Sequence, residues 1–205
     1  GCDPAIGDAG FCAMIVWGLN RHTGQRYLID IFNKRGMKNY GNIQRKIVEL
    51  VAKYGVGVAA IETAAHQSSI PRDQDFVREL KALGCKVAEY PTRTNMGGRA
   101  EHDEYDISKV GALFDEGLVT LPWMDADTRK AVKEYTDQLL DWRPKPEGAK
   151  SWKLVRDMVM ATLFAEYEAV QVMQRSKIES RPRPNLAPRW ARDRMRKWRK
   201  TPQPA

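Results

Sequence analysis

Short apolar runs bounded by glycine and polar residues fill the first part of the chain. Residues 1–6, 11–19 and 26–32 form three such runs, and short polar turns separate them. Runs of this length with turn residues between them predict β-strands. Because short turns join strands that run in opposite directions, we expect these three strands to form an antiparallel meander.

The spacing of apolar residues changes after residue 40. Apolar side chains recur at helical spacing over residues 42–54 and 73–83, and a glycine follows each segment, which predicts two helices. The run 56–61 between them lacks alternation, as expected of a strand covered on both faces. The remaining predicted elements are strands over 85–90 and 118–121 and helices over 104–116, 125–141 and 151–174.

The order of these elements predicts the fold class. Three hairpin-linked strands followed by alternating helices and strands indicate an α/β protein. We expect a mixed sheet of about five or more strands with helices on both faces, in an order that resembles the RNase H-like fold.

Positive charge is concentrated near the C-terminal end. The chain has a net charge of +8, yet residues 175–200 alone hold 11 Lys/Arg and 2 Asp/Glu, a net of +9. We therefore expect an RNase H-like domain over 1–175 and a basic, Pro/Arg-rich arm over 176–205. This asymmetry favours a polyanionic partner, nucleic acid before membrane.

The arm and one loop supply candidate DNA contacts. Prolines make residues 181–188 of the arm a predicted linker or extended segment, and Trp190 and Trp198 stand among the basic residues that follow. Two alternatives stay open for the arm: it docks on an acidic protein surface, or it only keeps the protein in solution. The expected phosphate contacts are Arg93 and Arg99, in the loop after the fifth predicted strand, and Arg189, Arg192, Arg196 and Lys197 in the arm.

The compartment follows from what the sequence contains. Three cysteines, Cys2, Cys12 and Cys85, lie in apolar segments, which predicts buried thiols in a reducing compartment. No apolar run is long enough to span a bilayer, and no secretory signal pattern occurs. The abrupt start at Gly1, inside a predicted strand, predicts that a segment precedes it.

Three carboxylates lie within or at the end of apolar segments. Asp3 is inside the first predicted strand, Glu62 ends the run 58–61, and Asp157 is in an apolar helical stretch. An unpaired charge inside an apolar element is costly. Each acid has a simpler interpretation: Asp3 as a turn residue, Glu62 as a solvated strand end, and Asp157 as the partner of a neighbouring base.

Taken together, the three acids favour a metal site. Clustered carboxylates repel one another and raise each other's pKa unless a cation neutralises them. Hard divalent cations prefer such oxygen ligands, and two of them about 3.5–4 Å apart promote hydrolysis of a phosphodiester. We expect Asp3 to bridge two ions and Glu62 and Asp157 each to complete one coordination sphere. Asp8 and the acidic cluster 101–104 are weaker candidates for further ligands.

Four segments follow one another in a characteristic order. They are Gly1-Cys-Asp-Pro-Ala-Ile within residues 1–13, Ile61-Glu62-Thr63, Leu118-Val-Thr-Leu-Pro122 and Arg156-Asp-Met-Val-Met-Ala161. Together they resemble the nuclease motifs of the large terminase subunits of tailed bacteriophages, over about residues 1–170.

This resemblance implies a nuclease that cuts concatemeric viral DNA around genome packaging with Mg²⁺ or Mn²⁺, in the host cytoplasm. Asp3, Glu62 and Asp157 carry over as the metal-binding acids. Double-stranded DNA would be the substrate, and the partners would be an upstream packaging ATPase domain, the portal and the small terminase subunit. The sequence departs from the family pattern in having Arg156 and Met160 where further acids are frequent, and no GxxxxGK[ST] motif of the ATPase occurs.

Two other functions stay open. A Holliday-junction resolvase shares the fold and the acids, but it acts as a dimer on four-way junctions. A catalytically silent nucleic-acid-binding module of the same fold is compatible with the missing acid beside Asp157.

Overall fold

The computed structural model describes residues 1–7, 11–63, 68–90, 101–142 and 157–179, with the backbone alone for 101–107 and 177–179. The strands are β1 (Cys2–Asp3), β2 (Phe11–Leu19), β3 (Arg26–Arg35), β4 (Val58–Glu62), β5 (Lys86–Tyr90) and β6 (Val119–Thr120). The helices are α1 (Tyr40–Tyr54), α2 (Ser69–Arg72), α3 (Gln74–Ala82), α4 (Glu101–Asp115), α5 (Ala126–Asp141) and α6 (Asp157–Glu179).

The strands of this described part form one mixed sheet in the order β5-β4-β1-β2-β3-β6. β1, β2 and β3 are antiparallel neighbours, which confirms the predicted meander. β4 is parallel to β1, β5 is parallel to β4, and β6 is parallel to β3. The α/β fold class is confirmed, and the order from β5 to β3 is the RNase H-like order.

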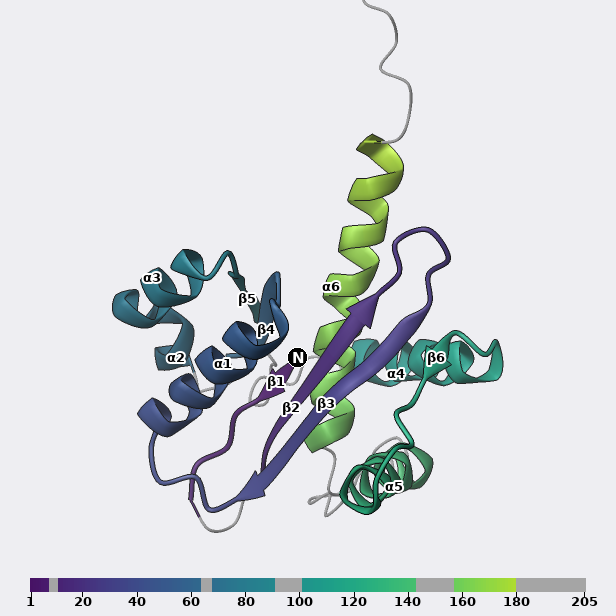
Figure 1. Cartoon of the computed structure of the whole chain (residues 1–205), viewed down its shortest axis with the longest axis horizontal. Coiled ribbons are helices and arrows are strands. Elements are labelled where there is room, and N and C mark those ends of the chain that lie inside the picture. Colours follow the sequence, from purple (N-terminus) through teal and green to yellow (C-terminus); the bar gives the residue numbers. More distant parts are fainter. Residues whose placement is uncertain (8–10, 64–67, 91–100, 143–156, 180–205) are drawn as a thin grey trace, which may run out of the picture.

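Helices cover both faces of the sheet (Figure 1). On one face Met14 and Val16 of β2 pack with buried residues of α1 and α3. On the other face Ala13 and Ile15 pack with buried residues of α5 and α6. Alternate residues of β2 therefore enter opposite layers, as the two-residue period of a strand requires.

Local sequence sets the ends of α1. The Asn39 side chain accepts a hydrogen bond from the Asn42 N–H at 2.9 Å, which satisfies a free donor at the start of the helix. Gly55 ends the helix in the left-handed conformation with φ 62°, which favours glycine. The end of this helix was predicted correctly from its glycine.

Several element bounds differ from the prediction. Only Cys2–Asp3 of the predicted strand 1–6 pairs as a strand, and Pro4 follows with no N–H to donate to the ladder. The four-residue helix α2 was not predicted, because it is too short to show a helical period. The predicted helix start at residue 151 lies outside the described residues, and α6 extends to Glu179, past the predicted boundary at 175–176.

All three cysteines are buried and free, as predicted. In the described residues no helix is both long and apolar enough to cross a membrane.

Candidate metal centre

β1 and β4 bring the two predicted strand acids together. Because Cys2 pairs with Ile61 in a parallel ladder, the residues that follow them, Asp3 and Glu62, lie beside each other. Both acids are buried, with 8% and 9% of their surface exposed. Their side chains lie within hydrogen-bonding reach of each other, and this contact is one of the causes that raise the pKa of Asp3.

The surroundings of Asp3 favour its neutral form. Burial raises the pKa of Asp3 well above its usual value, and the charge of Glu62, the hydrogen bond with Glu62 and the charge of Asp157 raise it further. Both burial and like charge penalise the ionised form of a carboxyl group. Without a cation Asp3 therefore keeps its proton to a higher pH than an exposed aspartate does.

The third predicted acid, Asp157, is the first residue of α6 and is half-buried. Its charge is one of the causes that raise the pKa of Asp3, so the start of the helix lies within electrostatic reach of the strand acids. The next residue, Met158, donates its N–H to the Gln138 side chain of α5 at 3.2 Å, which satisfies one of the free donors at the helix start.

A close approach between β1 and α6 places this helix. A Cβ added to Gly1 would lie 1.7 Å from the carbonyl oxygen of Ala161 and 2.8 Å from the backbone nitrogen of Ala165. Only glycine permits this approach. Figure 1 shows α6 running across the sheet at β1 and β2, so its first turn arrives near the end of β1 that carries Asp3.

Two polar contacts hold α6 against the sheet. Arg26, the first residue of β3, forms a buried ion pair with Glu166 in which Nε donates to Oε2 at 3.0 Å and Nη2 donates to Oε1. Tyr90, the last residue of β5, donates its hydroxyl to Oε1 of Glu168 at 2.6 Å. Burial, and then the hydrogen bond to Glu168, raises the pKa of Tyr90 above its usual value, so this hydroxyl remains a donor.

Asp3, Glu62 and Asp157 offer the carboxylate oxygens that a hard divalent cation prefers, although the three side chains do not form a complete coordination site. Within the described residues, no group of three His, Cys, Asp or Glu side chains has the geometry of a complete metal site. Asp3 and Glu62 are nevertheless buried and adjacent, and Asp157 lies within electrostatic reach of Asp3. A cation at this point would neutralise their charges, and Mg²⁺ and Mn²⁺ prefer all-oxygen ligands.

Two polar residues that were not predicted from the sequence share a row of the sheet with these acids. Asn33 of β3 pairs with Ala13, which in turn pairs with Asp3, and the Oδ1 atom of Asn33 is buried without a hydrogen-bond partner. Tyr90 pairs with Glu62. Tyr90 could have been predicted from its place at the end of a strand parallel to β4. Asn33 could not, because nothing in the sequence places it near the acids until the register of β3 is known.

The other predicted site residues stay predictions. The acidic cluster 101–104 forms the first turn of α4, of which the backbone alone is described. The following residues lie outside the described part of the chain: Asp8, Arg93, Arg99, Arg189, Arg192, Arg196 and Lys197.

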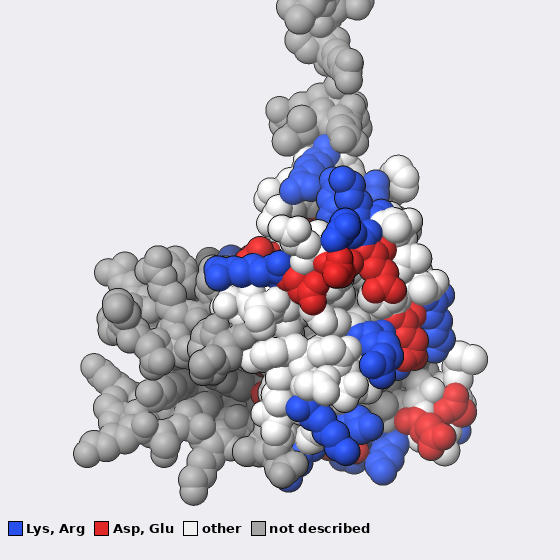
Figure 2. Space-filling model, turned by 90° about the vertical axis from the view of Figure 1, so that its left-hand side faces the viewer, with Lys and Arg blue, Asp and Glu red and all other residues white. Residues whose placement is uncertain are grey.

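Charge on the described body is mixed. Figure 2 shows lysines and arginines interspersed with aspartates and glutamates on the side that carries α1 and α3. Several of these charges form exposed pairs, such as Lys46 with Glu49 at 2.6 Å. This agrees with the sequence, in which the excess of positive charge begins at residue 175.

Comparisons with known proteins give distant likenesses to solved structures. No protein-family model and no curated protein sequence matches the chain. Fowlpox virus resolvase, solved with its substrate Holliday junction DNA, is 14% identical, with a TM-score of 0.47 over 83% of this chain and 95% of that one. RuvC from Thermus thermophilus is also 14% identical, with a TM-score of 0.39 over 83% of this chain and 94% of that one. The fold class accordingly rests on the strand order of the chain itself.

Proposed function

We propose that this chain is a divalent-metal-dependent DNA endonuclease. The observation that carries the proposal is the pair of buried, hydrogen-bonded acids Asp3 and Glu62 on adjacent parallel strands, with Asp157 within electrostatic reach. Two acids that repel each other inside a core weaken the fold, because the charged form of each is desolvated. A requirement to bind a cation explains why acids, rather than amides or apolar residues, occupy these positions.

Asp3, Glu62 and Asp157 would hold Mg²⁺ or Mn²⁺. When bound, such ions supply Lewis acidity for phosphodiester hydrolysis by water, so no side-chain nucleophile is required. The chain's own residues orient the site: β1 and β4 fix the two strand acids, and the contacts of α6 with the sheet fix the helix that begins at Asp157. Tyr90, beside Glu62, holds Glu168 of the same helix.

We further propose that the nuclease cuts concatemeric viral DNA during genome packaging. This proposal is supported by the order of the four sequence motifs, which resembles that of the large terminase subunits. On this proposal the substrate is double-stranded DNA in the host cytoplasm, and the partners are the packaging ATPase domain, the portal and the small terminase subunit. The alternative that uses the same acids is a resolvase acting on four-way junctions.

A nicking assay tests the metal-dependent activity. Supercoiled plasmid is incubated with the protein and Mn²⁺ or Mg²⁺, with an EDTA control and with the variants Asp3→Asn, Glu62→Gln and Asp157→Asn. Because each change removes a charged ligand while keeping the shape of the side chain, we expect each to lower the nicking rate about 100-fold or more.

Asp75→Asn is the matched control, because Asp75 is an exposed acid on α3 whose side chain is 88% exposed. It should nick DNA like the parent protein. Equal nicking by the parent and Asp3→Asn would contradict the proposal, as would full activity in EDTA. Linear duplex and a four-way junction, offered in the same assay, separate a packaging nuclease from a resolvase, since only the resolvase prefers the junction.

A further inference from the structure

One stretch of the body carries positive charge alone. Residues 31–48 hold five Lys/Arg and no Asp/Glu, although the charges of the chain outside residues 175–200 nearly cancel. Lys34, Arg35 and Lys38, at the end of β3 and just after it, are exposed, and we call these three residues the basic cluster. Among the described residues, none of the three forms an ion pair. Their charge is therefore available to an external anion.

The basic cluster lies at the same edge of the sheet as the candidate metal centre. β1, β3 and β4 run in the same direction, and they end at Asp3, Arg35 and Glu62. Asp3 shares a row with Asn33, and Arg35 lies two residues beyond that row. β1 and β3 both end toward the lower side of Figure 1, and Figure 2, turned about the vertical axis, shows lysines and arginines along that lower side.

Arg35 shares a face of the sheet with the acids. Asn33 pairs with Ala13, which packs toward α6, and side chains two residues apart in a strand point to the same face. The Arg35 guanidinium lies over the ring of its strand partner Phe11, 4.4 Å from the ring centroid. This contact attracts the cation to one place and occupies none of its N–H donors with a conventional acceptor.

The backbone of the cluster is fixed to the loop that follows Asp3. The Met37 carbonyl accepts a hydrogen bond from the Gly7 N–H at 3.1 Å. The Met37 side chain is buried in the core on the α1 side. Lys38 follows directly, so the cluster keeps a constant position relative to the acids.

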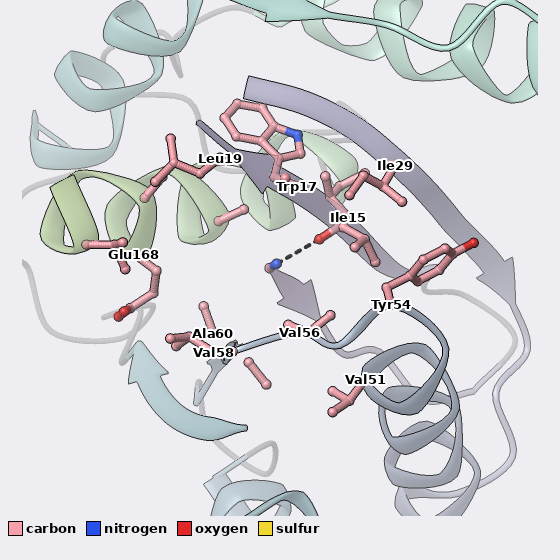
Figure 3. Close-up of a pocket in the computed structure, with 18 of the residues that line it drawn as sticks. Ile15, Trp17, Leu19, Ile29, Val51, Tyr54, Val56, Val58, Ala60 and Glu168 are labelled. Carbon is pink, nitrogen blue, oxygen red and sulfur yellow. Dashed lines mark hydrogen bonds between the residues drawn. The ribbon is translucent and has the colours of Figure 1, made fainter. Parts of the chain in front are cut away.

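The opposite edge of the sheet offers a different surface. A cavity of about 520 Å³ opens there, at the start of β1 and β4, and apolar side chains such as Ile15, Leu19 and Val56 form much of its wall (Figure 3). Apolar walls give a phosphate no opposite charge. The edge that carries the acids is therefore the one that suits a polyanion.

The spacing of Arg35 and Asp3 suits two phosphates of one DNA backbone. Two residues of a strand span about 6.6 Å and two strand spacings about 9.6 Å, so the two positions lie about 12 Å apart in the sheet. Phosphates of one DNA strand follow one another about every 3.4 Å along the helix axis. A backbone with one phosphate at the acids can thus place another, a few nucleotides away, at Arg35.

We propose that the basic cluster binds phosphates of the DNA strand to be cut, a few nucleotides from the cut, with Arg35 as its principal contact. The inference rests on the proposed function, since it takes DNA as the substrate. The C-terminal arm would supply most of the affinity, and the cluster would align the backbone at the acids, which by themselves repel phosphates. Such contacts position the DNA and read no base sequence.

A triple variant of the full chain, Lys34→Gln with Arg35→Gln and Lys38→Gln, tests the cluster. Its binding to a fluorescently labelled duplex is measured by anisotropy in EDTA at several salt concentrations. We expect the Kd to rise about 10-fold or more and the slope of log Kd against log salt to fall by up to about 3, because each lost phosphate contact lowers the slope by about 1. Arg35→Gln alone should lower it by about 1.

The matched control is Lys53→Gln with Lys81→Gln and Lys86→Gln, which removes the same charge from the opposite edge of the sheet. These exposed lysines lie in the last turns of α1 and α3 and at the start of β5. The control should bind DNA nearly like the parent protein, and both triple variants should keep its melting temperature.

Equal losses of affinity in the two triple variants would overturn the proposal, because net charge alone would then explain them. An unchanged Kd and slope in the first variant, or no duplex binding by the parent protein, would also overturn it. No DNA is cut in EDTA, so an absence of metal-dependent nicking would count against the proposed nuclease and leave this comparison of binding intact.

Discussion

Asp3 and Glu62 stand among apolar neighbours, and each lies next to a residue of the main core. Cys2 and Ile61, which precede them, are 5% and 0% exposed and pack on the α1 side. The acids point to the opposite face, where α6 begins. A shift of either strand by one residue would place the acids in the apolar layer, because side chains alternate between the faces. The register of β1 and β4 therefore places the two acids side by side on the same face of the sheet, where they form a candidate metal site.

The raised pKa of Asp3 predicts a pH-dependent stability for the metal-free protein. In the unfolded chain Asp3 ionises near its ordinary value, whereas in the folded protein burial and Glu62 keep it protonated to a higher pH. Below the unfolded pKa both states are protonated and Asp3 has no effect. As the pH rises from there through the folded pKa, Asp3 increasingly destabilises the fold. In EDTA, Asp3→Asn should therefore be more stable than the parent at pH 7.5 and nearly equal to it at pH 4.

Urea unfolding at the two pH values measures this difference. Added Mn²⁺ should stabilise the parent at pH 7.5 and leave Asp3→Asn almost unchanged, because a ligand stabilises only the state that binds it. A gain from Asp3→Asn that is the same at pH 4 and at pH 7.5 would contradict the assigned cause.

α6 depends on several short-range contacts with the sheet. The close approach at Gly1 sets its distance from β1, and the buried pair of Arg26 with Glu166 ties its middle to the start of β3. Arg26 also donates to the Gly24 carbonyl of the preceding turn. Because Asp157 begins this helix, the same contacts determine where the third candidate ligand lies.

Glu166→Ala should destabilise the protein by about 3–5 kcal/mol, because it leaves the Arg26 guanidinium buried without its partner. The double variant Arg26→Met with Glu166→Leu should recover most of this loss, since apolar residues of similar volume often replace a buried ion pair at little cost. Thermal or urea unfolding of the single and double variants measures both effects. A double variant no more stable than Glu166→Ala would contradict this explanation, because the loss would then not come from the unpaired charge of Arg26.

The whole molecule combines a body of mixed charge with a strongly basic C-terminal arm. Residues 175–200 account for more than the entire net charge of the chain, so any long-range attraction of the proposed DNA substrate would originate there. The candidate metal centre, by contrast, is acidic and would repel DNA phosphates in the absence of cations. We therefore expect the arm to supply affinity and the body to supply chemistry.

Replacing Arg189, Arg192, Arg196 and Lys197 together by alanine should weaken DNA binding and reduce its salt dependence. The slope of log Kd against log salt should fall by up to about 4, because each lost phosphate contact lowers it by about 1. Fluorescence anisotropy with a labelled duplex at several salt concentrations measures the slope, and the melting temperature should stay unchanged. An unchanged slope would favour the alternatives for the arm, docking on an acidic protein surface or a role in solubility alone.

The sequence by itself determined the fold class, and it named Asp3, Glu62 and Asp157 as candidate ligands, a role that stays a prediction. The meander, the alternation of helix and strand and the end of α1 at Gly55 follow from local patterns of apolar residues and glycines, and local structure obeys those patterns. Asp3 and Glu62 were visible because an acid in an apolar strand is conspicuous.

Tertiary structure decided what local patterns do not contain. The adjacency of Asp3 and Glu62, the row that adds Asn33 and Tyr90, and the ion pair of Arg26 with Glu166 join residues far apart in sequence, through strand register and helix packing. Register is set by the packing of both sheet faces at once, and no single segment carries that information.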